Sequence, residues 1–244
     1  MLYINKDSIP IKIQEQILQI EKTEEWKKIE EDDIKGIRAC FDSLDKGKIR
    51  EELVKEQHGL CAYCMRRITA DTSTIIEHYK PIRNKIDALN YKNLLGCCDG
   101  GRYSSDRNKV LCCDAAKRDK ELTIGPFNKE FVESLRYSKE GYIYTYPVNE
   151  KAESEINDIL KLNGERDDKG HLKYDTGTQL VATRKSTYKS YAAVMKRIEK
   201  RYSGNRNRIA SEIRRMISML ESQNEYLEFA GMILYLLKKR LKSN

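Results

Sequence analysis

The sequence predicts an α+β fold in which a small, cysteine-rich region lies between helical segments. Two observations support this prediction. Six of the seven cysteines lie between residues 60 and 120, where glycines and short apolar runs replace any long helical period. On either side of this section, apolar residues recur at the spacing of helices that bury one face.

The length and composition limit how the chain is organised. With 244 residues it can form one large domain or two modest ones. Its hydrophobic fraction of 39% and charged fraction of 34% are those of an ordinary soluble protein that is slightly rich in charge. We divide the chain into an N-terminal helical region (1–56), the cysteine-rich centre (57–130), a hairpin, helix and loop (131–179) and a basic helical region (180–244).

The N-terminal region is expected to contain two helices. The first covers residues 11–35, where isoleucines and one leucine precede a charged stretch around Trp26. The second runs from about Lys48 to His58. Gly59 is suited to end it, because glycine readily adopts the positive φ angle found just past a helix C-terminus.

A β-hairpin is expected in residues 131–148, with its turn at 139–141. Tyr142, Tyr144 and Tyr146 then fall on one face of the second strand, because side chains alternate along a strand. Such a row can stack on nucleobases. A half-buried position in the sheet is the more common arrangement, and it is the interpretation we favour.

The remainder of the chain is mainly helical. Residues 150–163 are expected to form a short helix, and residues 163–177, rich in glycine, asparagine and charge, a loop. From residue 180 to the end the pattern is helical, with one break at 203–205.

The sequence indicates a cytoplasmic protein without a membrane partner. Residues 1–10 mix charged with apolar residues and so lack the apolar core of an export signal. The longest nearly uninterrupted apolar run, 229–237, is too short to span a bilayer. Because the cytosol keeps thiols reduced, paired cysteines there indicate metal binding or catalysis before disulfides.

Positive charge is concentrated in the C-terminal quarter. The net charge of the chain is +8, but residues 180–244 carry 15 Lys and Arg against 5 Asp and Glu, a local net of +10, which leaves −2 for the rest. A basic excess favours polyanionic partners such as nucleic acid. The alternative is a solvated helical surface, and charge alone leaves both possible.

The cysteine spacing predicts a metal site. Cys61 and Cys64 form a CxxC knuckle, which places two thiolates on one tetrahedral Zn²⁺. The adjacent pairs Cys97/Cys98 and Cys112/Cys113 offer the other two ligands, and spacing leaves open which member of each pair is used. A redox-active CxxC is disfavoured because no thioredoxin-like βαβ pattern surrounds it. We interpret the isolated Cys40 as a small buried apolar residue.

A candidate catalytic motif lies between the knuckle and the later cysteines. His78, one of three histidines, follows Glu77 at the end of a β-branched run. Asn93 precedes two leucines, and Asp114 directly follows the last cysteine pair. In chain order the four segments read CAYC, EHYKP, YKNLLGCCDG and CCDAAK.

This order of motifs resembles that of the zinc-bearing HNH endonucleases, which have a ββα-metal core. More narrowly, it is similar to the HNH proteins of the Septu and retron antiphage systems, the PtuB-like group. The specific motifs cover residues 57–120, about a quarter of the chain. The resemblance implies an endonuclease that hydrolyses phosphodiester bonds of nucleic acid, with DNA favoured. It also implies structural Zn²⁺ beside a catalytic Mg²⁺ or Mn²⁺.

The resemblance selects the remaining zinc ligands. By the position of the family's third and fourth ligands, Cys98 and Cys113 join the knuckle. Cys97 and Cys112 would then pack as apolar neighbours. A zinc ion at this position would supply rigidity to a motif that has little hydrophobic core of its own.

The resemblance also implies catalytic roles. His78 corresponds to the general base that activates water, and Asn93 to the residue whose side-chain carbonyl fixes the imidazole. Glu77 and Asp114 correspond to the protein ligands of the catalytic metal, and carboxylate oxygens suit Mg²⁺ or Mn²⁺. The chemistry agrees, since a neutral imidazole can accept a proton from water and a divalent ion can bind the phosphate and the leaving oxygen.

Five other side chains are interpreted from their positions. Lys117, one turn past Asp114, and Arg66 and Arg67, beside the knuckle, are candidate phosphate contacts. For the two arginines, an ordinary surface role is equally open. His58 is expected to be structural, and His171, in the polar loop, receives no role.

The resemblance implies partners as well. These are a PtuA-like ATPase and, in retron versions, a reverse transcriptase with its DNA product. We expect that removing residues 180–244 weakens partner or substrate binding without destroying the metal site. Two alternatives stay open: an effector that cleaves RNA such as tRNA, and a non-catalytic zinc module that binds nucleic acid or protein.

Overall fold

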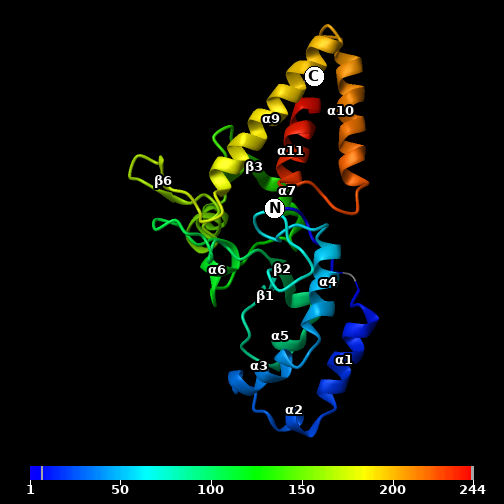
Figure 1. Cartoon of the computed structure of the whole chain (residues 1–244), viewed down its shortest axis with the longest axis vertical. Coiled ribbons are helices and arrows are strands. Elements are labelled where there is room, and N and C mark those ends of the chain that lie inside the picture. The colour runs from blue at the N-terminus through cyan, green and yellow to red at the C-terminus, as the bar shows by residue number, and fades with distance from the viewer. Residues whose placement is uncertain (7, 243–244) are drawn as a thin grey trace.

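Four short helices form one end of the elongated molecule (Figure 1). The computed structural model describes residues 1–6 and 8–242. The helices of this end are α1 (Ile11–Glu21), α2 (Glu24–Lys28), α3 (Ile34–Asp42) and α4 (Lys46–Glu56). They enclose a separate hydrophobic core that includes Trp26, Phe41 and the predicted buried Cys40.

The prediction of one continuous helix over residues 11–35 is wrong, because two residues inside it act as helix N-caps. Thr23 Oγ1 accepts a hydrogen bond from the Trp26 amide at 3.1 Å and starts α2. Asp33 Oδ1 accepts one from the Gly36 amide at 3.0 Å and starts α3. Side chains of this kind satisfy amides that a helix N-terminus leaves unpaired. The second predicted helix is confirmed as α4, with Gly59 at a φ of 74° just beyond it.

The cysteine-rich centre contains two strands followed by a short helix, in the predicted order. Strand β1 (Ile75–His78) pairs antiparallel with β2 (Leu94–Cys97), and His78 lies opposite Leu94 in the register. Three helical elements belong to this centre: α5 (Lys85–Leu89), the 3₁₀ turn η1 (Tyr91–Asn93) and α6 (Cys113–Lys117).

The hairpin expected at residues 131–148 begins later than predicted, and its second strand buries Ile143 and Thr145 instead of the tyrosines. The elements of this region are α7 (Lys129–Ser134), β3 (Leu135–Tyr137), β4 (Ile143–Thr145), α8 (Glu150–Ser154), the π-helical turn η2 (Glu155–Ile159), β5 (Glu165–Arg166) and β6 (Leu172–Tyr174). Ile143 and Thr145 are buried, whereas Tyr144 and Tyr146 are exposed. The interpretation of the tyrosines as half-buried is therefore confirmed for Tyr142 and wrong for Tyr144 and Tyr146. The expected short helix is confirmed as α8 and η2, and the expected loop contains the small β5–β6 hairpin.

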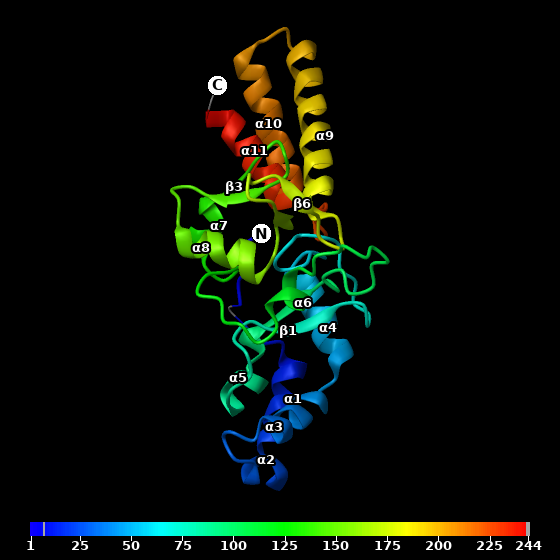
Figure 2. The same cartoon turned by 90° about the vertical axis from the view of Figure 1, so that its left-hand side faces the viewer.

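Three helices stand apart at the opposite end of the molecule (Figures 1 and 2). They are α9 (Leu180–Arg201), α10 (Arg206–Glu221) and α11 (Ala230–Lys242). The predicted break at 203–205 is confirmed, and a second one lies at 222–229. A small core that includes Met195, Ile213 and Leu237 holds the helices together. Within the described ranges, no helix combines the length and the apolar character needed to cross a membrane.

The largest core joins the cysteine-rich centre to the C-terminal helices. It contains the six central cysteines together with Leu180, Phe229 and Leu236. The Phe229 amide also donates a hydrogen bond to the Met65 carbonyl, next to the knuckle, at 3.0 Å. Because the two regions share one core, we expect that removing residues 180–244 would disturb the metal site, contrary to the expectation from the sequence.

Candidate metal centre and active site

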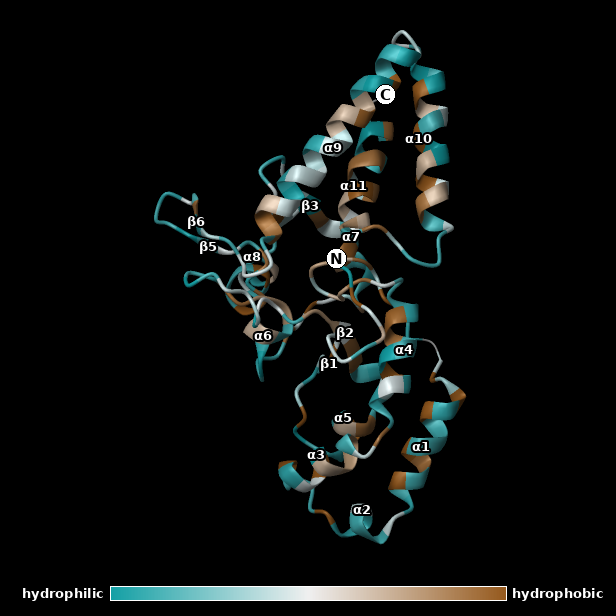
Figure 3. Cartoon of the chain, in the orientation of Figure 1, coloured by the Kyte–Doolittle hydropathy of each residue, from teal (hydrophilic) through white to brown (hydrophobic). Residues whose placement is uncertain are grey.

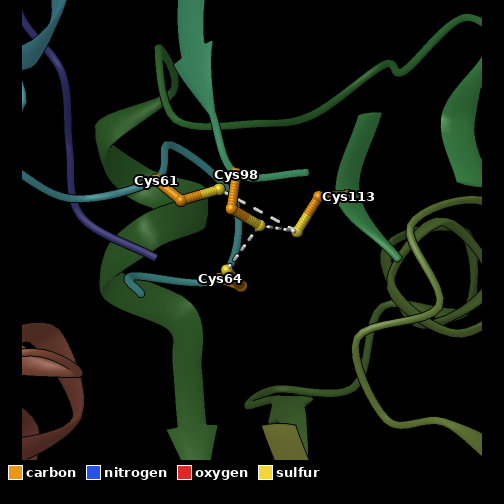
Figure 4. Close-up of side chains that lie close together, drawn as sticks. All are labelled: Cys61, Cys64, Cys98 and Cys113. Atoms are coloured by element: carbon orange, nitrogen blue, oxygen red, sulfur yellow. Dashed lines mark hydrogen bonds between the residues drawn. The ribbon is translucent and has the colours of Figure 1, made fainter. Parts of the chain in front are cut away.

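Four buried cysteines converge on one point (Figure 4). The Sγ atoms of the four all lie within 4.8 Å of one another. Three of the separations are 3.6 Å (Cys64–Cys98), 3.8 Å (Cys98–Cys113) and 3.9 Å (Cys61–Cys113). A tetrahedral zinc site with Zn–S bonds of about 2.3 Å requires sulfur atoms about 3.8 Å apart. The cluster therefore has the size needed to hold a metal ion such as zinc.

The local backbone explains why these cysteines meet. The knuckle is a tight turn after α4, closed by a hydrogen bond from the Met65 amide to the Cys61 carbonyl at 3.0 Å, and Met65 has a positive φ of 65°. Cys98 directly follows β2, and Cys113 begins α6. The Cys113 amide donates to the Leu160 carbonyl at 3.0 Å, which ties α6 to the segment after η2.

The cluster contains one cysteine from each adjacent pair, Cys98 and Cys113, and these are the two that the resemblance selected. Cys97 and Cys112 are fully buried but lie outside the cluster. The Cys112 Sγ is instead 3.6 Å from the Thr178 hydroxyl. Neighbouring side chains on an extended backbone point in opposite directions, so only one member of the Cys97/Cys98 pair can face the centre. At Cys113 the chain turns into α6 with a φ of 55°.

Gln57 is a positioning residue that the sequence did not indicate. Its Nε2 donates to the Leu60 carbonyl and to the Gly96 carbonyl, both at 2.8 Å, and its Oε1 accepts from the Gly96 amide at 2.7 Å. This buried amide therefore fixes the start of the knuckle to β2. No sequence signal marks it, because a glutamine at a helix end normally lies on the surface.

A buried group of charges lies between β1 and α6. Glu77 and Asp114 are both buried, and Lys117 Nζ lies 2.6 Å from Glu77 Oε1. Asp114 Oδ2 accepts from Arg102 Nη2, also at 2.6 Å, and Arg102 is partly exposed. Burial, followed by the adjacent Asp114, raises the pKa of Glu77, and the Lys117 ammonium opposes this shift. The two predicted metal-binding carboxylates therefore lie side by side, each with a cationic neighbour.

Lys117 occupies a different position from the one predicted. Its side chain is fully buried, and its Nζ also donates to the His78 carbonyl at 3.1 Å. A buried ammonium with these partners is removed from any surface contact with phosphate. Arg102, which the sequence did not indicate, is the cation at the rim of this group.

His78 faces away from the carboxylates, because consecutive side chains of a strand alternate. Its Nε2 lies 3.0 Å from the Ala88 carbonyl oxygen, and the edge of its ring packs on Phe41 with the ring centres 4.5 Å apart. A carbonyl only accepts hydrogen bonds, so Nε2 carries the proton and Nδ1 keeps a free electron pair. Burial lowers the pKa of His78 to about 4, against the opposing effect of the Ala88 bond. The imidazole is therefore neutral near pH 7.

Asn93 contacts backbone rather than the imidazole, which corrects the predicted contact. Its Oδ1 accepts from the Lys80 amide at 2.8 Å, and its Nδ2 donates to the Lys80 and Asp87 carbonyls at 2.9 and 3.0 Å. Asp87 directly precedes Ala88, the hydrogen-bond partner of His78. Asn93 therefore positions the imidazole indirectly, through the segment that carries the Ala88 carbonyl.

The two arginines beside the knuckle hold the C-terminal segment in place. Arg66 Nη1 donates to the Thr178 carbonyl, and Arg67 Nη2 to the Tyr226 carbonyl, both at 2.5 Å. Each guanidinium also has a glutamate of the C-terminal region within 3.6 Å. These contacts argue against the predicted phosphate role. His58 stacks on Tyr226 with ring centres 4.0 Å apart, in agreement with its structural interpretation.

No protein-family model matches the chain, and no curated protein is significantly similar to it in sequence. The function must therefore be inferred from the residues of the site and their geometry.

Proposed function

We propose that the chain is a metal-dependent endonuclease of the HNH type that hydrolyses phosphodiester bonds of nucleic acid, with DNA as the first substrate to test. The observation that supports this most is the state of His78. It ends β1, its Nε2 is engaged by the Ala88 carbonyl, and its Nδ1 keeps a free electron pair. The residue before it, Glu77, meets Asp114 at the start of α6.

His78 would act as the general base. In the proposed reaction, Nδ1 accepts a proton from a water molecule, and the water oxygen forms a bond to phosphorus. The bond between phosphorus and the leaving sugar oxygen breaks, and that oxygen receives a proton from solvent. Asn93 would keep the base in place by holding the Ala88 segment. Arg102, partly exposed beside Asp114, is the described cation best placed to meet the substrate phosphate.

The carboxylates of Glu77 and Asp114 fit a divalent cation such as Mg²⁺ or Mn²⁺. Glu77 Oε1 is buried, and the contact that the structure gives it is the ion pair with Lys117 Nζ at 2.6 Å. Glu77 and Asp114 would hold the ion, and no third His, Cys, Asp or Glu of the described part joins them. When bound, the ion would offset the negative charge that develops on the phosphate and the leaving oxygen.

We further propose that the four-cysteine centre holds structural zinc. Its ligands come from the turn after α4, the end of β2 and the start of α6. One ion would therefore tie together three segments that carry or support the catalytic residues. Structural zinc sites of this kind contribute directly to folding.

The resemblance to the PtuB-like group suggests a biological setting. In an antiphage system the chain would be the nuclease effector of a PtuA-like ATPase, and in a retron version it would also meet a reverse transcriptase and its DNA. The genes beside the coding sequence provide the simplest check. An adjacent ATPase gene supports this setting, and its absence from every related locus argues against it.

A non-catalytic zinc module is the second candidate function, and two observations favour it. His78 faces away from the carboxylates and contacts Ala88 and Phe41. Lys117 and Arg102 already pair with Glu77 and Asp114, so the carboxylates are compensated without a divalent ion. Cleavage assays separate the two functions. The purified chain, alone and with its ATPase partner, is incubated with plasmid DNA or bulk RNA in Mn²⁺ or in EDTA. We expect Mn²⁺-dependent cleavage that Glu77→Gln and Asp114→Asn abolish. Cleavage that persists in EDTA, or that both variants retain, would contradict the proposed mechanism, and RNA as the only substrate would favour the RNA-cleaving alternative.

A further inference from the structure

The three C-terminal helices and the segments between them form an arm, residues 180–242. All acidic side chains of this arm are engaged in ion pairs. Two glutamates pair with arginines of the arm itself, Glu199 with Arg240 and Glu212 with Arg215, and Glu221 pairs with Lys238. The other two, Glu225 and Glu228, face Arg67 and Arg66 beside the knuckle. No described glutamate of the arm is left to offset its remaining positive charge.

The far end of the arm is correspondingly basic. Nine exposed Lys and Arg side chains form no ion pair with any described residue: Lys185, Lys189, Lys196, Arg197, Lys200, Arg201, Arg206, Arg208 and Arg214. Most of them lie around the α9–α10 junction, which Figure 3 shows as predominantly hydrophilic. We define the arm tip as residues 196–214.

The arm tip lacks the features of a protein-docking surface. The exposed large apolar side chains of the described chain include none between residues 185 and 214. Protein interfaces depend on buried aromatic or aliphatic anchors at their centre. Phosphate backbones require only positioned positive charge, and they release counterions when they bind it. The arm tip therefore suits nucleic acid better than a protein partner.

We propose that the arm tip binds the phosphate backbone of the nucleic acid, at a fixed distance from the metal centre. The inference deepens the proposed nuclease function and rests on it for the position of the cleaved bond. Helix α9 starts beside the centre, where the Cys112 Sγ contacts Thr178. From Leu180 to Lys200 the helix rises about 30 Å at 1.5 Å per residue. A duplex that lies along α9 from its start to the arm tip spans roughly nine base pairs over this distance, at about 3.4 Å per base pair.

The test compares charge reversal at the two ends of the molecule. The arm variant is Arg197→Glu/Arg206→Glu/Arg208→Glu, in which two of the new glutamates lie in the first turn of α10, where acidic side chains favour a helix. The matched control is Lys22→Glu/Lys28→Glu/Lys35→Glu, with the same change in net charge on exposed positions of the N-terminal helices. Both are made in a His78→Ala chain, and binding to a fluorescent 30-base-pair duplex is measured by anisotropy without Mg²⁺ or Mn²⁺. Failure of catalysis therefore does not affect the result.

We expect the arm variant to bind the duplex at least tenfold more weakly than the parent. The slope of the logarithm of the binding constant against the logarithm of the salt concentration should become shallower by about two to three. The control should change binding by less than threefold. An equal loss of duplex affinity in both variants would mean that only net charge matters, and it would overturn the proposal. No loss of affinity in either variant would also overturn it. Loss of ATPase binding without loss of duplex binding would also overturn it, in favour of a protein partner. Unchanged circular dichroism and zinc content serve as the folding control.

A second inference concerns Arg184, the largest fully buried side chain of the described chain. Its Nη2 donates to the Leu162 carbonyl at 2.5 Å, but Nε and Nη1 have no hydrogen-bond partner in the described part. No described carboxylate forms an ion pair with it. A buried charge without a counter-charge is strongly unfavourable.

The four-cysteine centre can supply the missing negative charge. The segment of Leu160 and Leu162 joins the two places, because Leu160 accepts from the Cys113 amide and Leu162 accepts from Arg184. A zinc ion with four thiolates is a dianion. We infer that the Arg184 guanidinium compensates the charge of the zinc-loaded centre.

The test measures metal binding rather than activity. Zinc affinity is determined by competition with a chromophoric chelator for Arg184→Met, Arg184→Lys and the exposed control Lys185→Met. Loss of a group beside a metal centre typically weakens metal binding about 10- to 100-fold, which we expect for Arg184→Met, with a smaller loss for Arg184→Lys. The charge-transfer bands of the Co²⁺-loaded protein should also shift. If Arg184→Met does not fold, the Co²⁺ spectrum and the zinc affinity of Arg184→Lys are used to judge the inference. Unchanged affinity and spectrum in a folded variant would overturn the inference.

Discussion

Lys117 and Glu77 form an ion pair that is almost entirely withdrawn from solvent. Lys117 Nζ lies 2.6 Å from Glu77 Oε1, and the two side chains are 0% and 7% exposed. The pair connects β1 to α6 at the point where Asp114 adds a second carboxylate. The ammonium group therefore offsets negative charge that a divalent cation would otherwise meet.

Removing the ammonium should make the fold dependent on a divalent ion. Breaking a buried pair from one side costs roughly 3–5 kcal/mol, so Lys117→Met should lower the free energy of unfolding by that amount in EDTA. Mn²⁺ should restore part of it, because an ion that binds only the folded state stabilises it. Urea unfolding with and without Mn²⁺ measures both effects. The double variant Lys117→Met/Glu77→Gln should be more stable in EDTA than Lys117→Met alone and should respond little to Mn²⁺. Equal Mn²⁺ responses in the single and double variants would exclude Glu77 as a ligand.

The adjacent cysteine pairs allow a matched test of the zinc centre. Cys98→Ser and Cys113→Ser each remove a sulfur of the cluster, whereas Cys97→Ser and Cys112→Ser change buried neighbours outside it. The wild type should contain one zinc ion per chain after gel filtration. We expect the first two variants to lose zinc and solubility, since the folding energy of a structural zinc site is roughly 10 kcal/mol or more. The second two should keep zinc and lose only modest stability. Metal analysis that finds full zinc in Cys98→Ser would refute the ligand set.

The parts of the site that sequence predicts are those encoded by local spacing. A CxxC knuckle marks its own metal site, because both thiolates reach one ion within a single turn. The choice of Cys98 and Cys113 came from the resemblance, since spacing alone left it open. The order of the motifs also fits the positions of His78 at the end of β1 and Asp114 in the first turn of α6, whereas Asn93 lies in η1, just before β2 rather than on it. Features encoded by local spacing can be predicted because they depend on few contacts with distant parts of the chain.

Features that depend on distant contacts were not predictable. Arg66 and Arg67 look like free surface charges in sequence, but their partners lie in a segment more than a hundred residues away. Lys117 lies one turn past Asp114 in a charged helix, and only the packing of α6 on β1 buries it. The helix predicted at residues 11–35 failed for another reason, because the N-caps Thr23 and Asp33 outweigh the continuous apolar spacing.

Asn93 should support both stability and catalysis without taking part in proton transfer. Asn93→Ala removes hydrogen bonds to the Lys80 and Asp87 backbones and leaves buried groups without partners. Each such loss costs about 1–3 kcal/mol, which urea unfolding detects. We expect a smaller loss of cleavage rate than in His78→Ala, with zinc content unchanged. The exposed Asn108→Ala is the control and should match wild type in both assays. A rate loss as large as that of His78→Ala in a stably folded Asn93→Ala chain would contradict an indirect role.

Deletion of the whole C-terminal region should abolish folding of the metal centre. A chain that ends at Gln179 loses Leu180, Phe229 and Leu236 from the core that contains the cysteines. Truncating a single buried leucine to alanine already costs about 2–5 kcal/mol, so the loss of three large side chains exceeds the stability of an ordinary domain. The expected result is insoluble protein without stoichiometric zinc. A soluble, zinc-loaded chain of residues 1–179 would show that the shared core is not essential.

The last prediction concerns the chemistry of His78. His78→Ala should reduce cleavage by about 10²- to 10⁴-fold, the usual effect of losing a general base. Zinc content should not change, because the imidazole contacts Ala88 and Phe41 and is not part of the cysteine cluster. His171→Ala is the matched control, since that histidine lies exposed in the β5–β6 hairpin. The measurement is single-turnover cleavage of plasmid DNA in Mn²⁺, with the ATPase partner added where one is found. If the His78→Ala chain cleaves as fast as the His171→Ala chain when chemistry limits the rate, then His78 is not the base and the HNH mechanism does not apply to this protein.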